Sequence, residues 1–373
     1  MPLKIRFIIH DLCQGGAEKV LVNLVNNMNR DKFDITVMTL FDVGVNKQFL
    51  KQHIKYKSCF KRPIPGNSHL LKIFSPEMLY GLLIKDNYDI VVSYLEGPTA
   101  RIVGGAPKGV KTVSWIHSTI STQKALSASF RNEKEANRCY ERADAMVFVS
   151  ESVKDSFLSV CNTKNNFVLY NTNESESIKK KALEPIENFD FSNSFNWCAV
   201  GKLVTIKGYD RMLRIQKRLL DEGYNVHFHA LGIGEEEDSL KDFCKSSGIE
   251  NSVTFWGYQT NPYKYVSKCD LFVCASLSEG FSTAATEALI VGTPVCTVEV
   301  SGMKEMLGKN DEYGIVTKND ENDLYNAIKQ LLDDPALLKH YKMQANIRGE
   351  TFSTKNTVNA VEQFLDDLYN GVL

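Results

Sequence analysis

Residues 271–298 read LFVCASLSEGFSTAATEALIVGTPVCTV, and this stretch decides the fold. An apolar run over 271–275 is followed by a polar loop, a helical pattern over 283–291 and a second apolar run over 294–298. Short apolar runs bounded by turn residues predict strands, and nearly continuous apolar strands joined through helices predict a parallel sheet covered on both faces. The stretch therefore indicates one strand–helix–strand unit of an α/β fold.

The same alternation extends in both directions from this unit. In the first half, residues 17–28 have helical spacing, and strands are expected over 5–9, 35–40, 90–94, 112–116, 145–149 and 166–170. In the second half, strands are expected over 197–200, 226–231 and 252–256, and helices over 208–222, 235–247, 262–268 and beyond Glu321. The sequence predicts two Rossmann-like, doubly wound α/β domains in tandem. Ligands are expected at the carboxyl ends of the strands, and the active site in the cleft between the domains.

The length of 373 residues fits about two domains. The alternation pauses over 171–196, which is rich in Asn, Glu, Ser and Lys and contains Pro185. We interpret this pause as a linker. We therefore place the first domain at 1–185, with the linker, the second domain at 186–352 and a C-terminal helix at 353–373.

Composition excludes several classes of protein. Hydrophobic residues make up 43% and charged residues 24%, as in folded globular proteins. No apolar run reaches the roughly 18 residues that a membrane-spanning helix needs, and the N-terminal residues do not resemble a signal peptide. The nine cysteines form no CxxC pair and lie mostly in apolar runs, as expected for reduced thiols. We expect a cytoplasmic protein.

Charge is divided unevenly along the chain. Residues 1–185 contain 26 Lys and Arg against 18 Asp and Glu, a net charge of +8, and residues 186–373 contain 18 against 27, a net charge of −9. A basic half attracts phosphate-rich partners or an anionic membrane surface. Ordinary scatter of solvated lysines is the alternative explanation.

Two carboxylates accompany the predicted helix over 283–291. Ser282 is a natural N-cap, and Glu287 lies four residues after Thr283, on the same face near the helix start. Glu279 lies in the loop just before the helix. This arrangement offers backbone N–H groups to a phosphate and a carboxylate to sugar hydroxyls. Core packing would explain Ala284 and its alanine neighbours but not two carboxylates beside them, because unpaired buried carboxylates are costly.

Two lysines follow the first strand of the second domain. Lys202 and Lys207 lie in a loop bracketed by Gly201 and Gly208. Such lysines can converge on one diphosphate as point charges. The alternative is two exposed loop lysines without a shared ligand.

The first domain offers a glycine pair and a histidine. Gly15 and Gly16 lie between the first strand and the first helix, where they allow close approach of an anion or simply form a tight turn. The full G-x-G-x-x-G fingerprint of dinucleotide-binding domains is absent. His117 follows directly on a strand, where it is either a site residue or a satisfied structural histidine.

A metal site is not expected. His227 and His229 alternate on one strand, but no further ligand at metal-binding spacing accompanies them, so core packing is the favoured interpretation. No D-x-D triplet occurs in the chain. An enzyme acting on a nucleotide phosphate without such a clamp must neutralise charge with Lys, Arg and helix N-termini. We therefore expect no cofactor and no divalent metal.

Together these motifs resemble glycosyltransferase family 4, whose members are retaining enzymes of the GT-B fold. The likeness rests on Gly-Gly-Ala-Glu-Lys at 15–19, Gly-Lys-Leu-Val-x-x-Lys-Gly at 201–208 and Glu-Gly-Phe-Ser-x-x-x-x-Glu-Ala at 279–288. Weaker matches are Leu-Tyr-Asn at 169–171, Leu-Gly-x-Gly at 231–234, Trp-Gly-Tyr at 256–258 and Gly-x-x-Glu at 302–305. Many family members have Arg where this chain has Lys202, so this position departs from the pattern within the range of the family.

The resemblance implies roles for individual residues. Glu287 would bind the ribose hydroxyls, Lys202 and Lys207 the diphosphate, and Gly16 the distal phosphate from the first domain. Glu279, His117 and Lys207 are the predicted catalytic residues, with Glu279 approaching the donor sugar and His117 near its O6. The predicted nucleotide-sugar ligands are Gly15, Gly16, Gly201, Lys202, Lys207, Tyr258, Gly280, Phe281, Ser282, Thr283 and Glu287.

The resemblance also implies an activity. We expect transfer of a hexose or N-acetylhexosamine from a nucleotide sugar, UDP-linked by family frequency, to a saccharide or polyprenyl-diphosphate-linked acceptor in cell-surface polysaccharide synthesis. The acceptor would bind the first domain, onto which the C-terminal helix crosses back. No nucleic acid partner is expected. The basic stretch from Lys47 to Lys72 would contact the inner face of the cell membrane.

Three other functions stay open at this point. A nucleotide-sugar epimerase or hydrolase of the same fold would act on the donor without an acceptor. A nicotinamide-dependent oxidoreductase is disfavoured by the missing glycine fingerprint. A non-catalytic sensor of sugar nucleotides is disfavoured because both carboxylates and both lysines are present.

Overall fold

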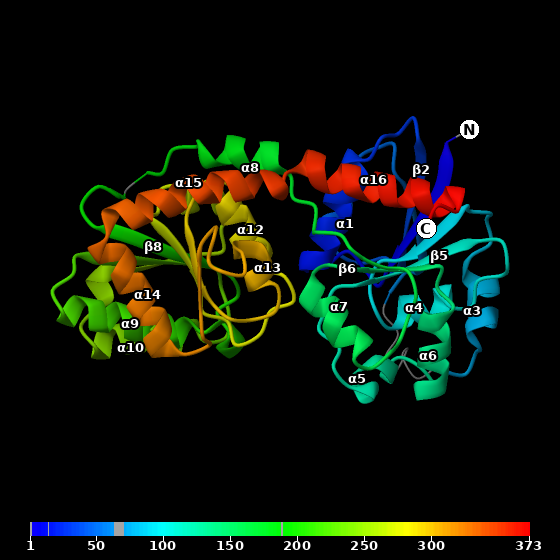
Figure 1. Cartoon of the computed structure of the whole chain (residues 1–373), viewed down its shortest axis with the longest axis horizontal. Helices are drawn as coiled ribbons and strands as arrows, with labels where there is room; N and C mark the ends of the chain where they lie inside the picture. The colour runs from blue at the N-terminus through cyan, green and yellow to red at the C-terminus, as the bar shows by residue number, and fades with distance from the viewer. Residues whose placement is uncertain (1, 14, 63–70, 188) are drawn as a thin grey trace. The chain divides into compact units, whose positions relative to one another are not determined.

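The computed structural model describes residues 2–13, 15–62, 71–187 and 189–373. Contacts divide the chain into two compact units, one with the residues up to Asn173 together with Thr354–Leu373, the other with Glu174–Ser353. The boundary thus follows Asn173, whereas we placed it after residue 185 from the sequence. Figure 1 traces both units and their elements.

The first unit contains a parallel seven-stranded sheet in the order β3-β2-β1-β4-β5-β6-β7. Its strands are β1 (Leu3–Ile9), β2 (Phe33–Phe41), β3 (Lys55–Phe60), β4 (Ile90–Ser93), β5 (Lys111–Ile116), β6 (Ala145–Phe148) and β7 (Asn166–Val168). The central strands are almost entirely buried, as the continuous apolar runs predicted.

Helices surround this first sheet. They are α1 (Gly16–Asn27), the short 3₁₀ helix η1 (Val45–Phe49), α3 (Pro76–Leu83), α4 (Pro98–Val103), α5 (Gln123–Ser127), α6 (Glu133–Glu141), α7 (Glu151–Leu158) and the C-terminal α16 (Thr354–Asn370). Helix α16 packs beside α1, as Figure 1 shows, and buries Val361 and Leu365. The last helix of the chain therefore belongs to the first unit.

The second unit contains a parallel six-stranded sheet in the order β10-β9-β8-β11-β12-β13. Its strands are β8 (Phe195–Val200), β9 (Val226–Leu231), β10 (Val253–Gly257), β11 (Leu271–Cys274), β12 (Val295–Val298) and β13 (Ile315–Thr317). Numbered within the unit, this order is the doubly wound 3-2-1-4-5-6 arrangement. The prediction of two doubly wound parallel sheets is confirmed.

The helices of the second unit pack on both sides of its sheet. They are α8 (Ser175–Ala182), η2 (Thr205–Lys207), α9 (Tyr209–Asp221), α10 (Glu237–Ser246), η3 (Glu250–Ser252), α11 (Tyr263–Val266), α12 (Thr283–Ile290), α13 (Met303–Leu307), α14 (Glu321–Asp333) and α15 (Pro335–Thr351). Trp197 and Phe228 are fully buried at the centre of its core, with α9 packed on β9 and α14 on β12. Among helices built from described residues, none is long and apolar enough to cross a membrane.

Several observed elements were not predicted from the sequence, among them two strands and a helix. Strands β3 and β13 were not predicted, because β3 alternates Lys55 and Lys57 with less polar residues at the sheet edge and β13 has only three residues. Helix α8 lies inside the expected linker. Its lysine-rich composition hides a short apolar face on which Ile178 and Ala182 are buried, and the helix packs against α11 and α12.

The strand orders fix where a ligand can enter each unit. The order reverses between β1 and β4 in the first sheet and between β8 and β11 in the second. In doubly wound folds, ligands bind outside the carboxyl ends of the neighbouring strands at such a reversal. The loops after β8 and β11 carry most of the predicted donor-site residues.

Candidate active site

A glycine contact holds together the loops after β8 and β11. Gly208 ends η2 with a φ of +68°, a conformation that favours glycine. A Cβ on Gly208 would lie 2.3 Å from the carbonyl oxygen of Ala275, at the end of β11. Because only a glycine allows this approach, the bracketing glycine of the lysine loop serves to bring Lys207 beside the β11 loop.

Lys207 and Glu279 form an ion pair at this position. The Lys207 Nζ lies 2.6 Å from Glu279 Oε1, and the Ser276 hydroxyl donates to the same oxygen at 2.8 Å. The Glu279 side chain is 12% exposed and that of Lys207 30%. The structure thus brings two predicted catalytic residues into direct contact. Lys202 is exposed, and among the described residues no hydrogen bond or ion pair joins it to this pair.

Helix α12 begins where the sequence predicted. Ser282 is its N-cap and accepts a hydrogen bond from the Ala285 N–H at 3.3 Å. Glu287 is 8% exposed and accepts a hydrogen bond from the Tyr263 hydroxyl at 3.1 Å. The N–H groups of the first turn carry partial positive charge that favours an anion. The helix therefore combines an anion-binding end with a carboxylate oriented by a tyrosine.

Phe281 plays a packing role in this loop. Its ring is 7% exposed and lies edge to face with Phe352, 5.9 Å between centroids. A Cβ on Gly302 would come within 2.7 Å of the Phe281 ring, which explains the glycine at that position. Since the ring is buried, Phe281 and Gly280 can offer a ligand their backbone groups.

The loops after β9 and β10 border the same edge of the sheet. A Cβ on Gly232 would lie 1.8 Å from the carbonyl oxygen of Gly201, so the loops after β8 and β9 also touch through glycine. Tyr258 follows the end of β10 and is 64% exposed. An exposed aromatic ring on this edge is suitable for stacking against a planar base.

In the first unit, Gly15 and Gly16 lie at the start of α1. Gly15 is the N-cap, without a side-chain cap, and a Cβ there would collide with the Glu18 carboxylate. A Cβ on Gly16 would meet no atom within 4 Å. The protein alone therefore does not require glycine at position 16, and its predicted approach to a phosphate stays a prediction.

His117 follows β5 and is neutral. Its ring lies 4.8 Å from that of Tyr94, and burial lowers the pKa of His117 to about 4. The His117 backbone N–H donates to Glu96 Oε2 at 3.0 Å, and the Ser118 hydroxyl donates to Glu96 Oε1. Glu96, at the end of β4, thus fixes the loop that carries the predicted catalytic histidine.

The two histidines on β9 are structural. His229 Nε2 contacts Asn196 Oδ1 at 2.9 Å, and the Trp256 indole N–H donates to His229 Nδ1 at 3.0 Å. His227 Nε2 contacts the Thr254 hydroxyl at 2.8 Å. In the part of the chain that the structure describes, no group of three or more His, Cys, Asp and Glu could hold a metal ion.

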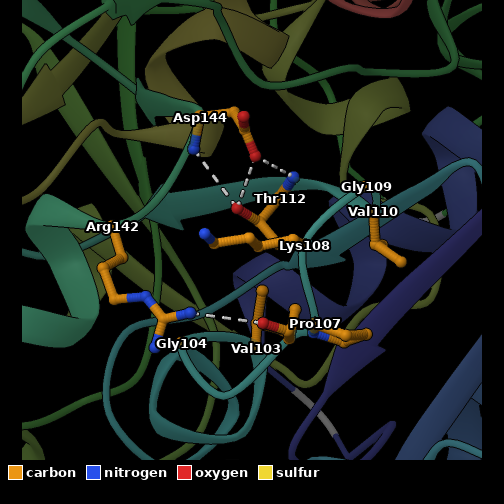
Figure 2. Close-up of a pocket in the computed structure, with 10 residues that line it drawn as sticks. Val103, Gly104, Pro107, Lys108, Gly109, Val110, Thr112, Arg142 and Asp144 are labelled. Atoms are coloured by element: carbon orange, nitrogen blue, oxygen red, sulfur yellow. Dashed lines mark hydrogen bonds between the residues drawn. The ribbon is translucent and has the colours of Figure 1, made fainter.

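A cavity of about 320 Å³ opens elsewhere in the first unit. Figure 2 shows Thr112, Arg142, Lys108 and Asp144 around it. Asp144 accepts hydrogen bonds from the backbone N–H and the hydroxyl of Thr112, at 2.8 and 2.9 Å. These residues precede or begin β5 and β6, so the cavity lies at the amino edge of the sheet. It contains none of the predicted site residues.

Three contact residues were missing from the sequence-based site. Ser276 was part of the quoted motif, three residues before Glu279, and its hydroxyl was the available signal. Tyr263 and Glu96 had no such signal, because Tyr263 reaches Glu287 from helix α11 and Glu96 reaches the His117 backbone from the loop after β4. Sequence spacing does not report contacts of that kind.

Two family profiles match the chain. The profile described as Glycosyltransferase Family 4 matches residues 14–171, and that described as Glycosyl transferases group 1 matches residues 184–348. The two matches follow each other along the chain with a short gap between them.

Curated relatives include named bacterial enzymes. The N-acetylgalactosamine-N,N'-diacetylbacillosaminyl-diphospho-undecaprenol 4-alpha-N-acetylgalactosaminyltransferase of Campylobacter jejuni is 28% identical over 365 residues, covering 94% of this chain and 95% of that protein. The capsular polysaccharide biosynthesis glycosyltransferase CapM of Staphylococcus aureus is 24% identical, covering 75% of this chain and 74% of its own.

Solved structures share the fold. HepE of Anabaena in complex with UDP superposes with a TM-score of 0.78 at 19% identity, covering 98% of this chain and 100% of that one. The apo form of the lipopolysaccharide outer core galactosyltransferase WaaB gives 0.74 at 20% identity, covering both chains fully. Profiles, relatives and fold agree that the chain belongs to glycosyltransferase family 4 and is a glycosyltransferase of the GT-B fold.

Proposed function

We propose that this glycosyltransferase moves a hexosyl or N-acetylhexosaminyl group from a UDP sugar to a saccharide acceptor linked to a lipid, in the synthesis of a bacterial polysaccharide or glycolipid. The contact between Lys207 and Glu279, three residues before the cap of α12, carries the proposal. A departing nucleoside diphosphate builds negative charge, which a lysine and a helix N-terminus stabilise. The names of the Campylobacter relative and the UDP complex of HepE support this choice of substrates.

Each part of the second-unit site has a role in this proposal. Glu287, oriented by Tyr263, accepts hydrogen bonds from the ribose hydroxyls, and Tyr258 lies beside the base. Lys202 and Lys207 contact the diphosphate, with the N–H groups of the first turn of α12. Lys207 is held by Glu279 before the donor binds and is partly exposed, so an arriving diphosphate can share it.

The reaction proceeds with retention and without a metal ion in our proposal. Lysines and the α12 N-terminus take the place of a cation on the leaving phosphate. The acceptor attacks the donor sugar on the face from which the diphosphate departs. Glu279 and His117 contact the donor sugar in this proposal. The cleft between the domains, expected from the sequence, stays a prediction.

Calorimetric titration with UDP, GDP and ADP in excess EDTA tests the donor assignment. UDP should bind most tightly, and Glu287→Ala should weaken it about tenfold or more, the loss of one charged hydrogen bond. Lys207→Ala should mainly slow turnover, and Lys217→Ala, at a partly exposed lysine paired with Asp221, is the matched control. Absence of binding to any of the three nucleotides would contradict the proposal. Turnover of the donor without an acceptor would instead indicate an epimerase or hydrolase.

The proposed membrane-binding surface differs in part from the stretch expected from the sequence. Within the stretch from Lys47 to Lys72, residues 63–70 lie outside the described residues, and Lys47, Lys55 and Lys57 pair with acidic side chains. We therefore propose a surface that adds exposed apolar residues near α3 to Lys61 and Arg62. These are Ile73 at 68%, Met78 at 54% and Leu82 at 55% exposure.

Binding to vesicles tests this surface. Cosedimentation with phosphatidylglycerol-containing vesicles should exceed that with neutral vesicles and should decrease with salt. Met78→Ser with Leu82→Ser should reduce it severalfold, whereas Met343→Ser, at an exposed methionine on α15, should not. Equal sedimentation with both kinds of vesicle would contradict the proposed contact.

A further inference from the structure

Three arginines on α9 lie on the side of the helix that packs against α14. Arg211, Arg214 and Arg218 are spaced three and four residues apart, so they share one face. Arg214 Nη2 lies 2.8 Å from Glu321 Oε2, and Arg218 Nε lies 3.7 Å from Glu222 Oε1. Arg211 is 8% exposed, and among the described residues no Asp or Glu forms an ion pair with it. The most buried of the three arginines is thus the one without a carboxylate.

The Arg211 guanidinium is only partly satisfied. Its Nη1 donates to Asn319 Oδ1 at 2.9 Å, but Nε and Nη2 are buried and have no hydrogen-bond partner among the described atoms. Arg211 also lies in the first turn of α9, where the partial positive charge of the helix N-terminus disfavours a cation. A buried charge with unsatisfied donors destabilises the folded state. Stability alone would therefore favour an apolar side chain at this position.

The hydrogen bond from Arg211 fixes how the Asn319 amide is oriented. An arginine has only donors, so the atom that faces Nη1 must be the carbonyl oxygen Oδ1. The amide nitrogen Nδ2 then donates to the Ser276 carbonyl oxygen, at 3.4 Å. With the amide reversed, two carbonyl oxygens would face each other at that position. Arg211 thus selects the orientation in which Asn319 can bind the loop after β11.

Ser276 connects Asn319 to Glu279. Ser276 follows the end of β11 and is 2% exposed, and its hydroxyl donates to Glu279 Oε1 at 2.8 Å. The same carboxylate oxygen also lies 2.6 Å from Lys207 Nζ. A series of three hydrogen bonds, all inside the second unit, therefore joins the buried Arg211 to the predicted catalytic carboxylate.

We propose that Arg211 and Asn319 are positioning residues for Glu279. The inference rests on the proposed glycosyl transfer, in which the diphosphate of the donor shares Lys207. Glu279 then loses part of its contact with that lysine and depends on Ser276 to keep its position beside the donor sugar. Asn319 holds the carbonyl group of Ser276, and Arg211 holds Asn319. Neither positioning residue touches the donor or the acceptor.

Turnover and stability together test this role in the full-length protein. Arg211→Met should lower turnover with the active UDP sugar about tenfold or more, because catalysis is sensitive to small displacements of a reacting group. Its affinity for UDP, which lacks the sugar, should stay within about twofold of wild type. Its urea midpoint should not fall, since an apolar side chain replaces an unpaired buried charge. Arg211→Lys, which can still donate to Asn319, should regain most of the turnover.

Arg218→Met is the matched control. Arg218 makes the same kind of hydrogen bond, to Asn322 Oδ1 at 2.9 Å, but from an exposed position further along α9, so its loss should leave turnover unchanged. Turnover of Arg211→Met equal to that of the control would overturn the proposal. A fall in turnover matched by a fall in the urea midpoint would also overturn it, because that result would show only a packing role.

Hydrogen exchange of the loop after β11 keeps this inference separate from the proposed function. Without any substrate, amide exchange of residues 276–281, followed by mass spectrometry, should be severalfold faster in Asn319→Ala than in wild type. Asn322→Ala is the control and should exchange as wild type does. Unchanged exchange in Asn319→Ala would overturn the link between Asn319 and the loop, whatever the donor proves to be. Faster exchange in a protein that transfers no sugar from any UDP sugar would support the link and count against the proposed function alone.

Discussion

Replacement of His229 by Gln tests how the donor-binding unit is held together. His229 lies on β9 and is fully buried. The Trp256 indole can only donate, so His229 Nδ1 must accept from it and Nε2–H must donate to Asn196. A second ring proton would face the indole N–H with no acceptor. The folded second unit therefore requires neutral His229.

The size of the stability loss at low pH follows from proton linkage. Burial, and then the nearby His227, lower the pKa of His229 to about 3 from its ordinary value of 6.5. The unfolded chain takes up a proton below pH 6.5, whereas the folded chain does not until about pH 3, so stability is lost as pH falls through this window. For one such group, the free energy of unfolding changes by at most about 1.4 kcal/mol per pH unit. Between pH 7 and pH 5, the titration of His229 alone should cost the second unit about 2 kcal/mol.

Urea unfolding at pH 7 and pH 5 measures this loss. Two of the three tryptophans, Trp197 and Trp256, lie in the second unit and Trp115 lies in the first, so tryptophan fluorescence in a Trp115→Phe background reports on the second unit. In His229→Gln, the amide can still accept from Trp256 and donate to Asn196, but it does not titrate. The variant should therefore lose about 2 kcal/mol less than wild type between the two pH values. An equal loss in both proteins would refute the reasoning, because His227 and the carboxylates are common to both.

Three further substitutions have expected outcomes. Gly208→Ala should destabilise the second unit by at least about 2 kcal/mol, from the left-handed conformation and the clash with Ala275. Its urea midpoint should fall, and an unchanged midpoint would count against the loop contact. Glu135→Gln should cost the first unit about 3 kcal/mol in thermal unfolding, because it leaves the Arg101 charge buried without its ion-pair partner. Ser282→Ala should cost about 1 kcal/mol and weaken UDP binding measured by calorimetry, and full UDP affinity would argue against an anion at the α12 end.

Most of the fold could be predicted from the sequence because the central strands are buried on both faces. Runs such as 145–149 and 271–275 are apolar throughout, and this pattern identifies strands in parallel sheets directly. The edge strand β3 lacks this apolar pattern, because much of its surface is exposed. Its lysines make the stretch look like a loop in the sequence. Helix α8 was hidden for a related reason, because three of its eight residues are lysines.

Part of the candidate site could likewise be predicted from the sequence, and part could not. Local signals such as the Ser282 cap and the Glu279 to Glu287 spacing identify residues that one loop and one helix present together. The contacts of those residues depend on neighbouring elements, as the hydrogen bond from Tyr263 on α11 to Glu287 shows. The switch point beside β1 follows from the strand order, which reverses between β1 and β4, and no local sequence pattern marks it. The hydrophobic periodicity of the sequence does not reveal the order of the strands in the sheet.

Glycosyl transfer by the purified protein tests the central claim most directly. The assay supplies a panel of UDP hexoses and UDP N-acetylhexosamines, a lipid-linked saccharide acceptor and excess EDTA, and the anomeric configuration of the product is determined by NMR. We predict that one donor yields a glycosylated acceptor with the configuration of the donor retained. An inverted product, or transfer that appears only when a divalent metal is restored, would contradict the account.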